Sequence, residues 1–198
     1  MPDNAVEEII AAGHRLADRG LAYAHSGNIS RRLDGSAILI TASGVFKGGL
    51  NERDVLRLDL QGQVRQGENG RQPSSETALH LALYQNYPHI KAIAHAHPPY
   101  ATALACADRE LEWRLLEESR LFLGQVPLLP RLSAGSPELA QAAARAAKGV
   151  NALLLANHGA VSWGESMEEA LCRMEILEHT AKLMLLRSLF ARGINDHV

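Results

Sequence analysis

The sequence predicts an α/β fold in which a mixed sheet is covered by helices. Segments with the period of an amphipathic helix alternate along the chain with short apolar segments typical of strands. Two turn signals, Asp34-Gly35 and Gln61-Gly62, lie between strand-like segments and predict β-hairpins. Hairpins join antiparallel strands, so they argue against a purely parallel sheet. The 198 residues suit one domain with a sizeable core and show no linker, so we expect a single domain over residues 1–198.

The N-terminal elements follow from periodicity and turn residues. An apolar stripe from Val6 to Ala17 predicts a helix, which Gly20 is placed to end. Apolar and polar residues alternate over 55–60, as in a half-buried strand. In chain order, we expect a helix over residues 3–19, strands over 29–33, 37–41 and 55–60, a short partner strand after Gly62, and a polar loop over 67–73.

Caps and apolar runs place the later elements. The Ser74 hydroxyl suits a helix N-cap, Pro137 suits the first position of a helix, and Ser166-Met167-Glu168-Glu169 has the pattern of a capping box. Gly193 is expected to end the last helix. In chain order, we expect a helix over 74–86, a strand over 90–97, a helix from Pro98-Pro99, a strand over 126–129, an alanine-rich helix from Ser136, a buried strand over 152–156 and a long helix from 166 to 192.

Composition argues against several classes of partner. The chain has 20 Lys and Arg residues against 22 Asp and Glu residues, a formal net charge of −2 with histidine neutral. Nucleic acids and anionic membranes require a basic surface, so we expect neither as a partner. Cys106 and Cys172 are far apart and suggest no disulfide framework, which favours a reducing compartment. Neither a signal peptide nor a membrane-spanning apolar run is visible, so we expect a cytoplasmic protein.

Three histidines predict a metal site. His95 and His97 are two residues apart on a predicted strand, so both side chains point to the same face. His158 follows a predicted buried strand and could complete a set of three nitrogen ligands, the number common in catalytic zinc sites. Such ligands suit zinc best, and iron, cobalt, nickel and copper also accept them. The alternative is a pair of solvent-facing histidines on an edge strand. His14, His80, His89 and His179 are expected to be surface residues or hydrogen-bonded core residues, and His25, which precedes the Gly27 loop, could also line a pocket.

Small, hydroxyl-rich segments predict an anion site. Ser26-Gly27-Asn28-Ile29-Ser30 and Thr41-Ala42-Ser43-Gly44 lie at the open end of the first hairpin, where they come close in space. Loops of this kind let backbone N–H groups converge on an anion. Ser74 and Ser75 add two hydroxyls at a predicted helix N-terminus, which favours negative charge. Each segment alone fits an ordinary turn or cap, and their combination suggests a phosphate site.

Five motifs in this order and spacing resemble the class II aldolase/adducin family, over roughly Val6 to Leu189. They are Ser26-Gly27-Asn28-Ile29-Ser30, Ile40-Thr41-Ala42-Ser43-Gly44, Pro73-Ser74-Ser75-Glu76, His95-Ala96-His97 and Asn157-His158-Gly159.

The resemblance implies a three-layer α/β/α fold around a central, mostly antiparallel mixed sheet. It implies a divalent metal on His95, His97 and His158, by preference Zn²⁺, with Mn²⁺, Fe²⁺ or Co²⁺ as alternatives. It also implies phosphate binding by a set of small residues and a homotetramer with active sites at its interfaces. The implied phosphate ligands are Gly27, Asn28, Ser43, Gly44, Ser74 and Ser75.

The activity implied is that of an aldolase. A small phosphorylated ketose would be cleaved by retro-aldol chemistry through a metal-stabilised enediolate, with Glu76 as general base. The family aldolases use a tyrosine beyond the histidine pair, but no tyrosine follows Tyr100 here. Glu117 or Glu118 lies near that position, as in the family's dehydratases and epimerases, so Glu117 is a second candidate acid/base. A 4-epimerase, a dehydratase, a decarboxylase and a metal-containing module without catalysis remain alternatives.

Overall fold

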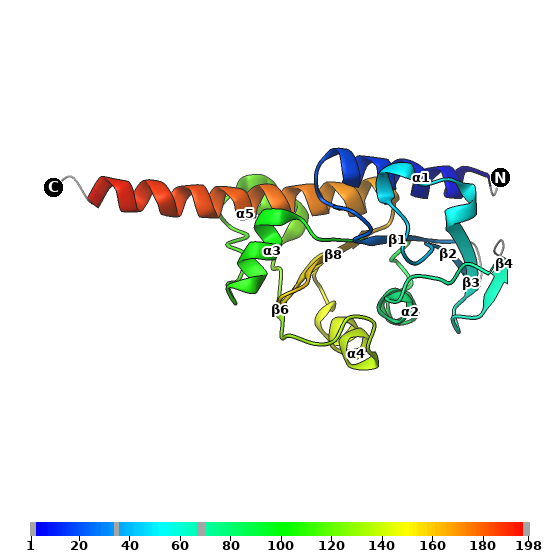
Figure 1. Cartoon of the computed structure of the whole chain (residues 1–198). Coiled ribbons are helices and arrows are strands. Elements are labelled where there is room, and N and C mark those ends of the chain that lie inside the picture. The colour runs from blue at the N-terminus through cyan, green and yellow to red at the C-terminus, as the bar shows by residue number, and fades with distance from the viewer. Residues whose placement is uncertain (1–2, 34–35, 67–69, 196–198) are drawn as a thin grey trace.

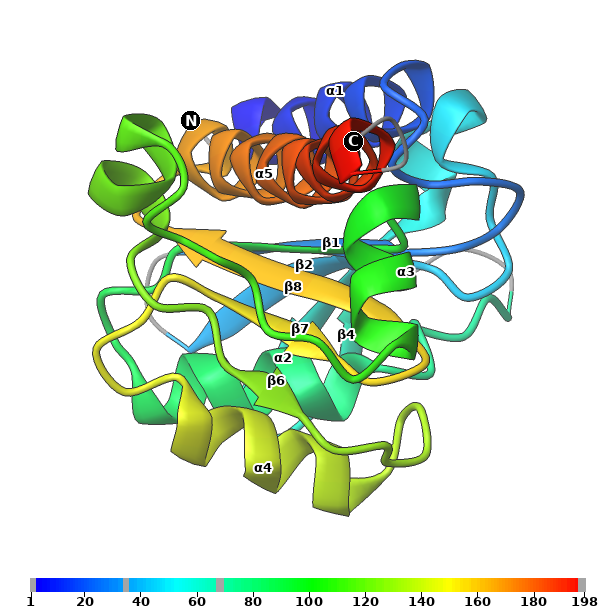
Figure 2. The ribbon, with the colours of Figure 1, turned by 90° about the vertical axis from the view of Figure 1, so that its left-hand side faces the viewer.

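The computed structural model describes residues 3–33, 36–66 and 70–195 and has one eight-stranded sheet between two layers of helices (Figure 1). Helices α1 (Asp3–Asp18) and α5 (Met167–Asn195) cover one face of the sheet, and α2 (Thr77–Asn86) and α4 (Pro137–Ala146) cover the other (Figure 2). The predicted three-layer α/β/α fold is confirmed.

The strand order is β4-β3-β2-β1-β5-β8-β7-β6. Within the described residues, neighbouring strands are antiparallel except for β6 and β7. The helices are α1 Asp3–Asp18, α2 Thr77–Asn86, α3 Pro99–Cys106, α4 Pro137–Ala146 and α5 Met167–Asn195. The strands are β1 Asn28–Arg32, β2 Ala37–Thr41, β3 Val55–Asp59, β4 Val64–Gln66, β5 Ala92–Ala96, β6 Leu128–Leu129, β7 Ala152–Leu155 and β8 Gly159–Gly164. Short helical turns occur at Lys47–Gly49, Glu52–Asp54 and Ser119–Leu123.

Both pairs of strands that the turn signals predicted are present. β1 pairs with β2 and β3 pairs with β4, each in antiparallel register. The second hairpin turns through Gly62, whose φ of +83° is readily reached only by a residue without a Cβ. The first predicted turn, Asp34-Gly35, lies outside the described residues.

Two buried apolar clusters hold the layers together. One joins α1, α3 and α5 to one face of the sheet, with Ile9, Leu16 and Met174 fully buried. The other joins α2 and α4 to the opposite face around Leu83 and Trp163. β5, β7 and β8 are buried along their whole lengths, because helices cover both faces of this part of the sheet.

The structure corrects two predicted helix boundaries and one predicted capping box. The helix expected from Ser74 begins at Thr77, because Ser74 N–H donates to Thr41 O and ties this segment to the end of β2. The last helix passes through Gly193 and reaches Asn195, since a single glycine disfavours a helix by only about 1 kcal/mol. At its start, Ser166 Oγ accepts the Glu169 N–H, but the Glu169 carboxylate accepts Glu165 N–H instead of closing the capping box.

One strand was not predicted. β8 runs between β5 and β7 in the middle of the sheet. It is bounded by Gly159 and Gly164 and is buried along its whole length, so its sequence lacks the alternation of a half-buried strand. In the described part of the chain, no helix is long and apolar enough to cross a membrane.

Candidate active site

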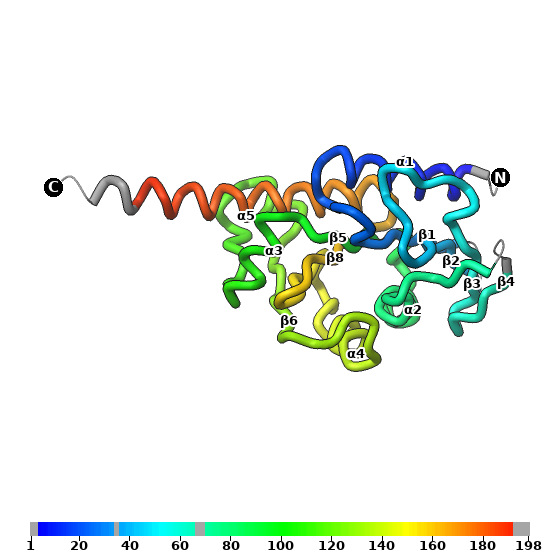
Figure 3. Tube along the Cα trace, in the orientation of Figure 1, coloured from blue at the N-terminus to red at the C-terminus, as the bar shows by residue number. Residues whose placement is uncertain are grey.

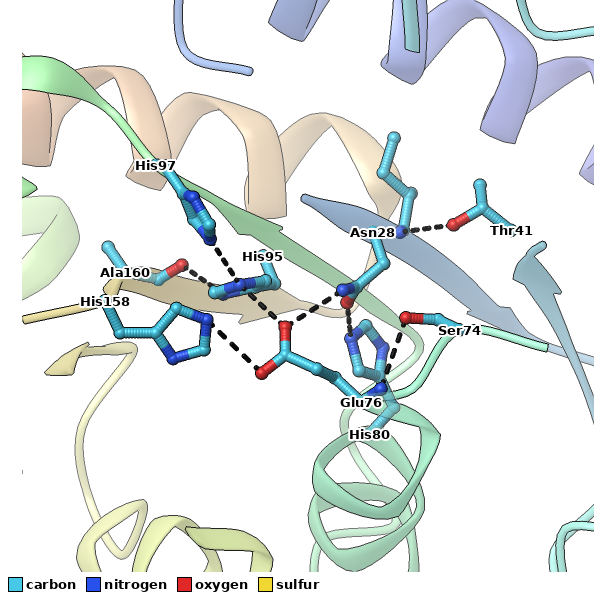
Figure 4. A network of polar contacts seen from close by, with 10 residues as sticks. Asn28, Thr41, Ser74, Glu76, His80, His95, His97, His158 and Ala160 are labelled. Atoms are coloured by element: carbon cyan, nitrogen blue, oxygen red, sulfur yellow. Dashed lines mark hydrogen bonds and ion pairs between the residues drawn. The ribbon is translucent and has the colours of Figure 1, made fainter. Parts of the chain in front are cut away.

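The ends of several strands meet at one edge of the sheet and carry the predicted site residues. β1 begins at Asn28, β2 ends at Thr41, β5 ends at Ala96 and β7 ends at Leu155. Asn28 pairs with His95 across β1 and β5, and β2 lies antiparallel on the other side of β1. The segments next to these ends therefore converge at one place (Figure 4).

Three histidine side chains, those of His95, His97 and His158, point toward a common centre (Figure 4). One ring nitrogen from each lies within 4.8 Å of the others. The Nε2 atoms of His95 and His97 are 3.2 Å apart. His95 lies in β5 and His97 directly follows it, so the strand alternation that predicted this pair is kept. The three nitrogens could hold one metal ion.

A tight turn after β7 brings His158 to this centre. Asn157 has a φ of +57°, a left-handed conformation that asparagine tolerates better than most residues. Gly159 follows, and a Cβ there would lie 2.4 Å from the carbonyl oxygen of Ala96. Only glycine therefore lets the start of β8 approach the end of β5, which places His158 beside His95.

The Glu76 carboxylate faces the same centre from the opposite side of the site. Its Oε2 atom is 2.8 Å from His95 Nε2, and its Oε1 atom is 3.4 Å from His158 Nε2. Glu76 directly precedes α2 and is buried. Its N–H donates to Ser74 Oγ at 3.3 Å, which orders the turn that presents it. Among the described residues, Oε1 is buried without a hydrogen-bond donor.

The hydrogen bonds show that this centre suits a cation. His95 Nδ1 is 3.0 Å from Ala160 O, and because a carbonyl only accepts, Nδ1 carries the proton. In the neutral ring, the Nε2 lone pair then points at the Glu76 carboxylate and at His97 Nε2. Lone pairs that converge in this way repel one another unless a positive charge lies between them. The donor set therefore fits a divalent metal ion, with Ala160 O fixing the orientation of one ligand.

Local electrostatics favour the protonation states in which these groups can bind a metal ion. Burial raises the pKa of Glu76, but its interactions with the imidazoles of His95 and His158 and the hydrogen bond from Asn28 together outweigh burial, so this pKa lies below its ordinary value. Burial lowers the pKa of His97 to about 4 and also lowers the pKa of His158. At neutral pH, Glu76 is therefore an anion and these two imidazoles are neutral, as metal binding requires.

A buried chain of hydrogen bonds holds Glu76 in place. Asn28 Nδ2 donates to Glu76 Oε2 at 3.1 Å, so Asn28 Oδ1 is the atom that faces His80 Nε2, at 2.6 Å. His80 Nε2 must then carry the proton, and its Nδ1 accepts from Ser30 Oγ at 2.6 Å. Ser30 Oγ in turn accepts from Tyr84 OH at 2.8 Å. Burial lowers the pKa of His80 to about 3, so this ring stays neutral.

The predicted phosphate residues lie beside this centre. Thr41–Gly44 runs next to Ser74, with Ser43 N–H donating to Gln72 O at 2.9 Å. The backbone N–H groups of Gly27, Gly44 and Ser75 donate to no acceptor within the described residues. The Ser26 hydroxyl is also buried and has no hydrogen-bond partner among the described residues. The Asn28 side chain, by contrast, already bonds to Glu76 and His80.

The structure does not bring Glu117 to this centre. Its side chain is exposed and forms an ion pair with Arg120 at 2.7 Å. This pairing lowers the pKa of Glu117, so the carboxyl group is ionised at neutral pH. Glu118 is also exposed. Within one chain, neither residue contacts the histidines.

The role of His80 in this site was not predicted. It was expected to be a surface residue or a hydrogen-bonded core residue. It is fully buried, and its hydrogen bond to Asn28 connects it to Glu76. The signal in the sequence is its spacing: His80 lies four residues after Glu76, and its N–H donates to Glu76 O at 3.4 Å across the first turn of α2, so the two residues lie on the same side of that turn.

Comparison with known proteins identifies the family of this chain. The model of the family described as Class II Aldolase and Adducin N-terminal domain matches residues 7–185. An L-fuculose phosphate aldolase of Methanococcus vannielii is 34% identical over 178 residues, which cover 90% of this chain and 94% of the relative. A 3-oxo-tetronate 4-phosphate decarboxylase of Haemophilus influenzae is 35% identical over 188 residues, 92% of this chain and 88% of the relative.

Solved structures show the same architecture. A structure of an L-fuculose 1-phosphate aldolase superposes with a TM-score of 0.86 and 34% identity, covering 94% of this chain and 87% of that one. Sequence and structure comparisons therefore agree on one family over nearly the whole chain.

Proposed function

This chain belongs to the class II aldolase and adducin family, and on that premise we propose that it is a metal-dependent lyase. The substrate is a small phosphorylated ketose, and the reaction breaks a C–C bond by retro-aldol chemistry. The observation that carries the proposal is the convergence of three imidazoles and the Glu76 carboxylate on one centre, with Glu76 Oε2 2.8 Å from His95 Nε2. A module without catalysis would not need a buried carboxylate at this place.

His95, His97 and His158 are the ligands of the metal, for which Zn²⁺ is our first choice because all three donors are imidazole nitrogens. When bound, a divalent cation polarises a substrate carbonyl and stabilises the negative charge that develops as the C–C bond breaks.

Glu76 moves the proton. Retro-aldol cleavage turns a substrate hydroxyl into the carbonyl of the released aldehyde, so that hydroxyl gives up its proton, and the enediolate fragment that remains must gain a proton at carbon. In our proposal the Glu76 carboxylate takes the first proton and returns it to that carbon. The Glu76 carboxylate lies at the centre where that fragment forms, and Asn28 holds it at 3.1 Å in a fixed orientation. In the reverse direction the same carboxylate removes the proton from carbon.

The phosphate group binds beside the metal centre. Free N–H groups of Gly27, Gly44 and Ser75 and the hydroxyls of Ser43 and Ser75 supply the donors. Ser74 supports this site through its backbone bond to Thr41. Asn28 contributes through its position at the start of β1, because its side chain is engaged with Glu76.

Decarboxylation of a phosphorylated keto acid is the second candidate. It is supported by the absence of tyrosine after Tyr100 and by a decarboxylase among the relatives at 35% identity. It needs the same stabilised enediolate and the same proton delivery by Glu76. Glu117 would act only if a neighbouring subunit brought it to the site, and its role stays a proposal.

The homotetramer also stays a proposal, supported by α5. The C-terminal part of this helix extends beyond the rest of the molecule (Figures 1 and 3). Leu185, Leu189 and Phe190 on this part are 46%, 54% and 71% exposed. Apolar side chains on a projecting helix favour association with other copies. Light scattering should give four times the chain mass, and a monomer at micromolar concentration would contradict it.

The function is tested by offering candidate phosphorylated ketoses and keto acids to the metal-loaded protein. Retro-aldol cleavage releases a triose phosphate from a ketose, which a coupled enzyme assay detects. Release of CO₂ from a keto acid would favour the second candidate, and an isomeric sugar alone would indicate an epimerase. No reaction with any substrate, with metal bound, would contradict a catalytic function.

A further inference from the structure

A cleft of about 410 Å³ opens next to the metal centre and has no place in the function described so far. Residues 131–134 line it on one side, and residues 156–158, including His158, line it on the other. The cleft therefore leads directly to one of the three histidines. Any role for it in substrate binding rests on the function proposed above.

The order of strands places this cleft across the metal centre from the phosphate site. Ser43 and Gly44 follow the end of β2 and Gly27 precedes β1. β5 carries His95, and β7 leads to His158. β6 lies beyond β7, runs parallel to it, and leads to Arg131 at the same edge of the sheet. A substrate with its phosphate at β1 and β2 and its carbonyl at the histidines therefore extends its other end toward Arg131.

The loop after β6 also closes this path from one side. It begins at Arg131 beside His158 and reaches Gly135, which lies against Ser75 of the phosphate site. Gly135 has a φ of +74°, and a Cβ there would lie 2.5 Å from the carbonyl oxygen of Ser75. The loop therefore runs from the cleft to the phosphate site as one wall of the substrate path.

Among the described residues that line the cleft, Arg131 is the only arginine, and no lysine, aspartate or glutamate lies with it. In the same part of the chain, its guanidinium has no hydrogen bond and no ion pair to the protein. Most other arginines near the sheet are engaged, such as Arg31 with Glu8 at 2.9 Å. A free guanidinium beside a metal ligand suits a planar anion, because its fork of N–H donors matches a carboxylate in a bidentate pair.

We propose that Arg131 binds a carboxylate at the end of the substrate opposite its phosphate, so that among phosphorylated keto sugars the enzyme prefers those that carry a terminal carboxylate, the sugar acids, to neutral ones. Arg131 is then a specificity-determining residue. A neutral sugar phosphate leaves the guanidinium in water and gains nothing from it.

Two six-carbon probes, long enough to extend from the phosphate site across the metal centre, test this assignment. 6-Phosphogluconate carries a phosphate and a carboxylate at opposite ends, whereas glucitol 6-phosphate has a hydroxymethyl group in place of the carboxylate. Calorimetric titration of the metal-loaded protein should show 6-phosphogluconate binding about tenfold more tightly. In Arg131→Gln that preference should fall to within about twofold, while glucitol 6-phosphate binds as in the parent protein.

Arg145→Gln is the matched control. Arg145 is an exposed arginine on α4 that does not line the cleft, so this variant removes the same charge and should keep the preference. If Arg131→Gln still preferred the carboxylate probe, or if the parent protein bound both probes equally well, this inference would be overturned and the proposed phosphosugar function would stand. If Arg131→Gln lost affinity for both probes equally, Arg131 would bind the phosphate, and this inference would be overturned as well. Failure of the parent protein to bind either probe would overturn the phosphosugar function together with this inference.

Discussion

At the scale of single residues, the account depends most on Glu76. Its carboxylate is buried, lies 2.8 Å from His95 Nε2 and receives a hydrogen bond from Asn28. Because the amide of glutamine can keep these contacts without taking a proton, Glu76→Gln should retain its metal and lose at least about 100-fold in kcat. Steady-state kinetics together with metal analysis check this.

Glu138→Gln serves as the control for that variant. Glu138 is exposed in the first turn of α4, away from the histidines, so its loss should leave kcat unchanged. A Glu76→Gln enzyme as active as the control would show that Glu76 does not move the proton.

His80 is a positioning residue, since it touches Asn28 and not the metal centre. In His80→Leu the Asn28 amide loses the donor that fixes its orientation, and we expect kcat to fall about tenfold with metal content and KM nearly unchanged. Gln at the same position can donate an N–H to Asn28 Oδ1, so His80→Gln should recover much of the rate. Equal losses in the two variants would point to a packing effect.

At the scale of elements, the turn between β7 and β8 controls the geometry of the site. Gly159→Ala would place a Cβ 2.4 Å from Ala96 O and push β8 away from β5. We expect a destabilisation of about 1–3 kcal/mol and weaker metal binding, because His158 moves with the turn. Thermal unfolding and metal titration check both effects.

The control for that prediction is Gly49→Ala. A Cβ at Gly49 would meet only the Phe46 side chain, at 3.4 Å, an ordinary contact. This variant should therefore unfold and bind metal like the parent protein. If Gly159→Ala matched it in both measurements, the close approach of β8 to β5 would not matter for the site.

Elements with a local signal could be predicted from the sequence, and those shaped by distant contacts could not. The helix at Pro137 begins where its cap and proline indicate, with Ser136 Oγ accepting the Leu139 N–H. The helix expected at Ser74 begins later, because that segment bonds to the end of β2. β8 has glycines at both ends and buried residues throughout, so only its partners β5 and β7 make it a strand.

The same distinction holds for the site residues. The two-residue spacing of His95 and His97 encodes their common direction, so that pair could be found locally. The link from His80 through Asn28 to Glu76 joins β1 to α2, and nothing in either segment alone indicates it. The position of the free Arg131 guanidinium could likewise not be predicted, because it depends on the pairing of β6 with β7.

At the scale of the whole molecule, a buried lysine makes stability depend on pH. Lys47 is 1% exposed, and its ammonium group donates to Val45 O at 2.6 Å. Burial lowers its pKa from 10.5 to about 8, partly offset by the charge of Asp54. Between these two values the unfolded chain holds a proton that the folded chain has lost, so the folded state gains stability as pH rises.

Because of Lys47, the free energy of unfolding should rise by about 3 kcal/mol as the pH rises through the interval between its two pKa values, about 8 and 10.5. Lys47→Met removes the ionisable group and should therefore be more stable than the parent protein at pH 7, with the difference shrinking toward pH 10. Urea unfolding of both proteins at several pH values measures it. A difference that stays constant with pH would show that Lys47 titrates normally in the fold.

The central claim is that His95, His97 and His158 bind one metal ion beside Glu76. Elemental analysis of the purified protein and of His97→Ala and Glu76→Gln variants tests it most directly. We expect one equivalent of a divalent transition metal per chain, kept in Glu76→Gln and lost in His97→Ala together with activity. A folded parent protein that turns over substrate after complete removal of metal would contradict it.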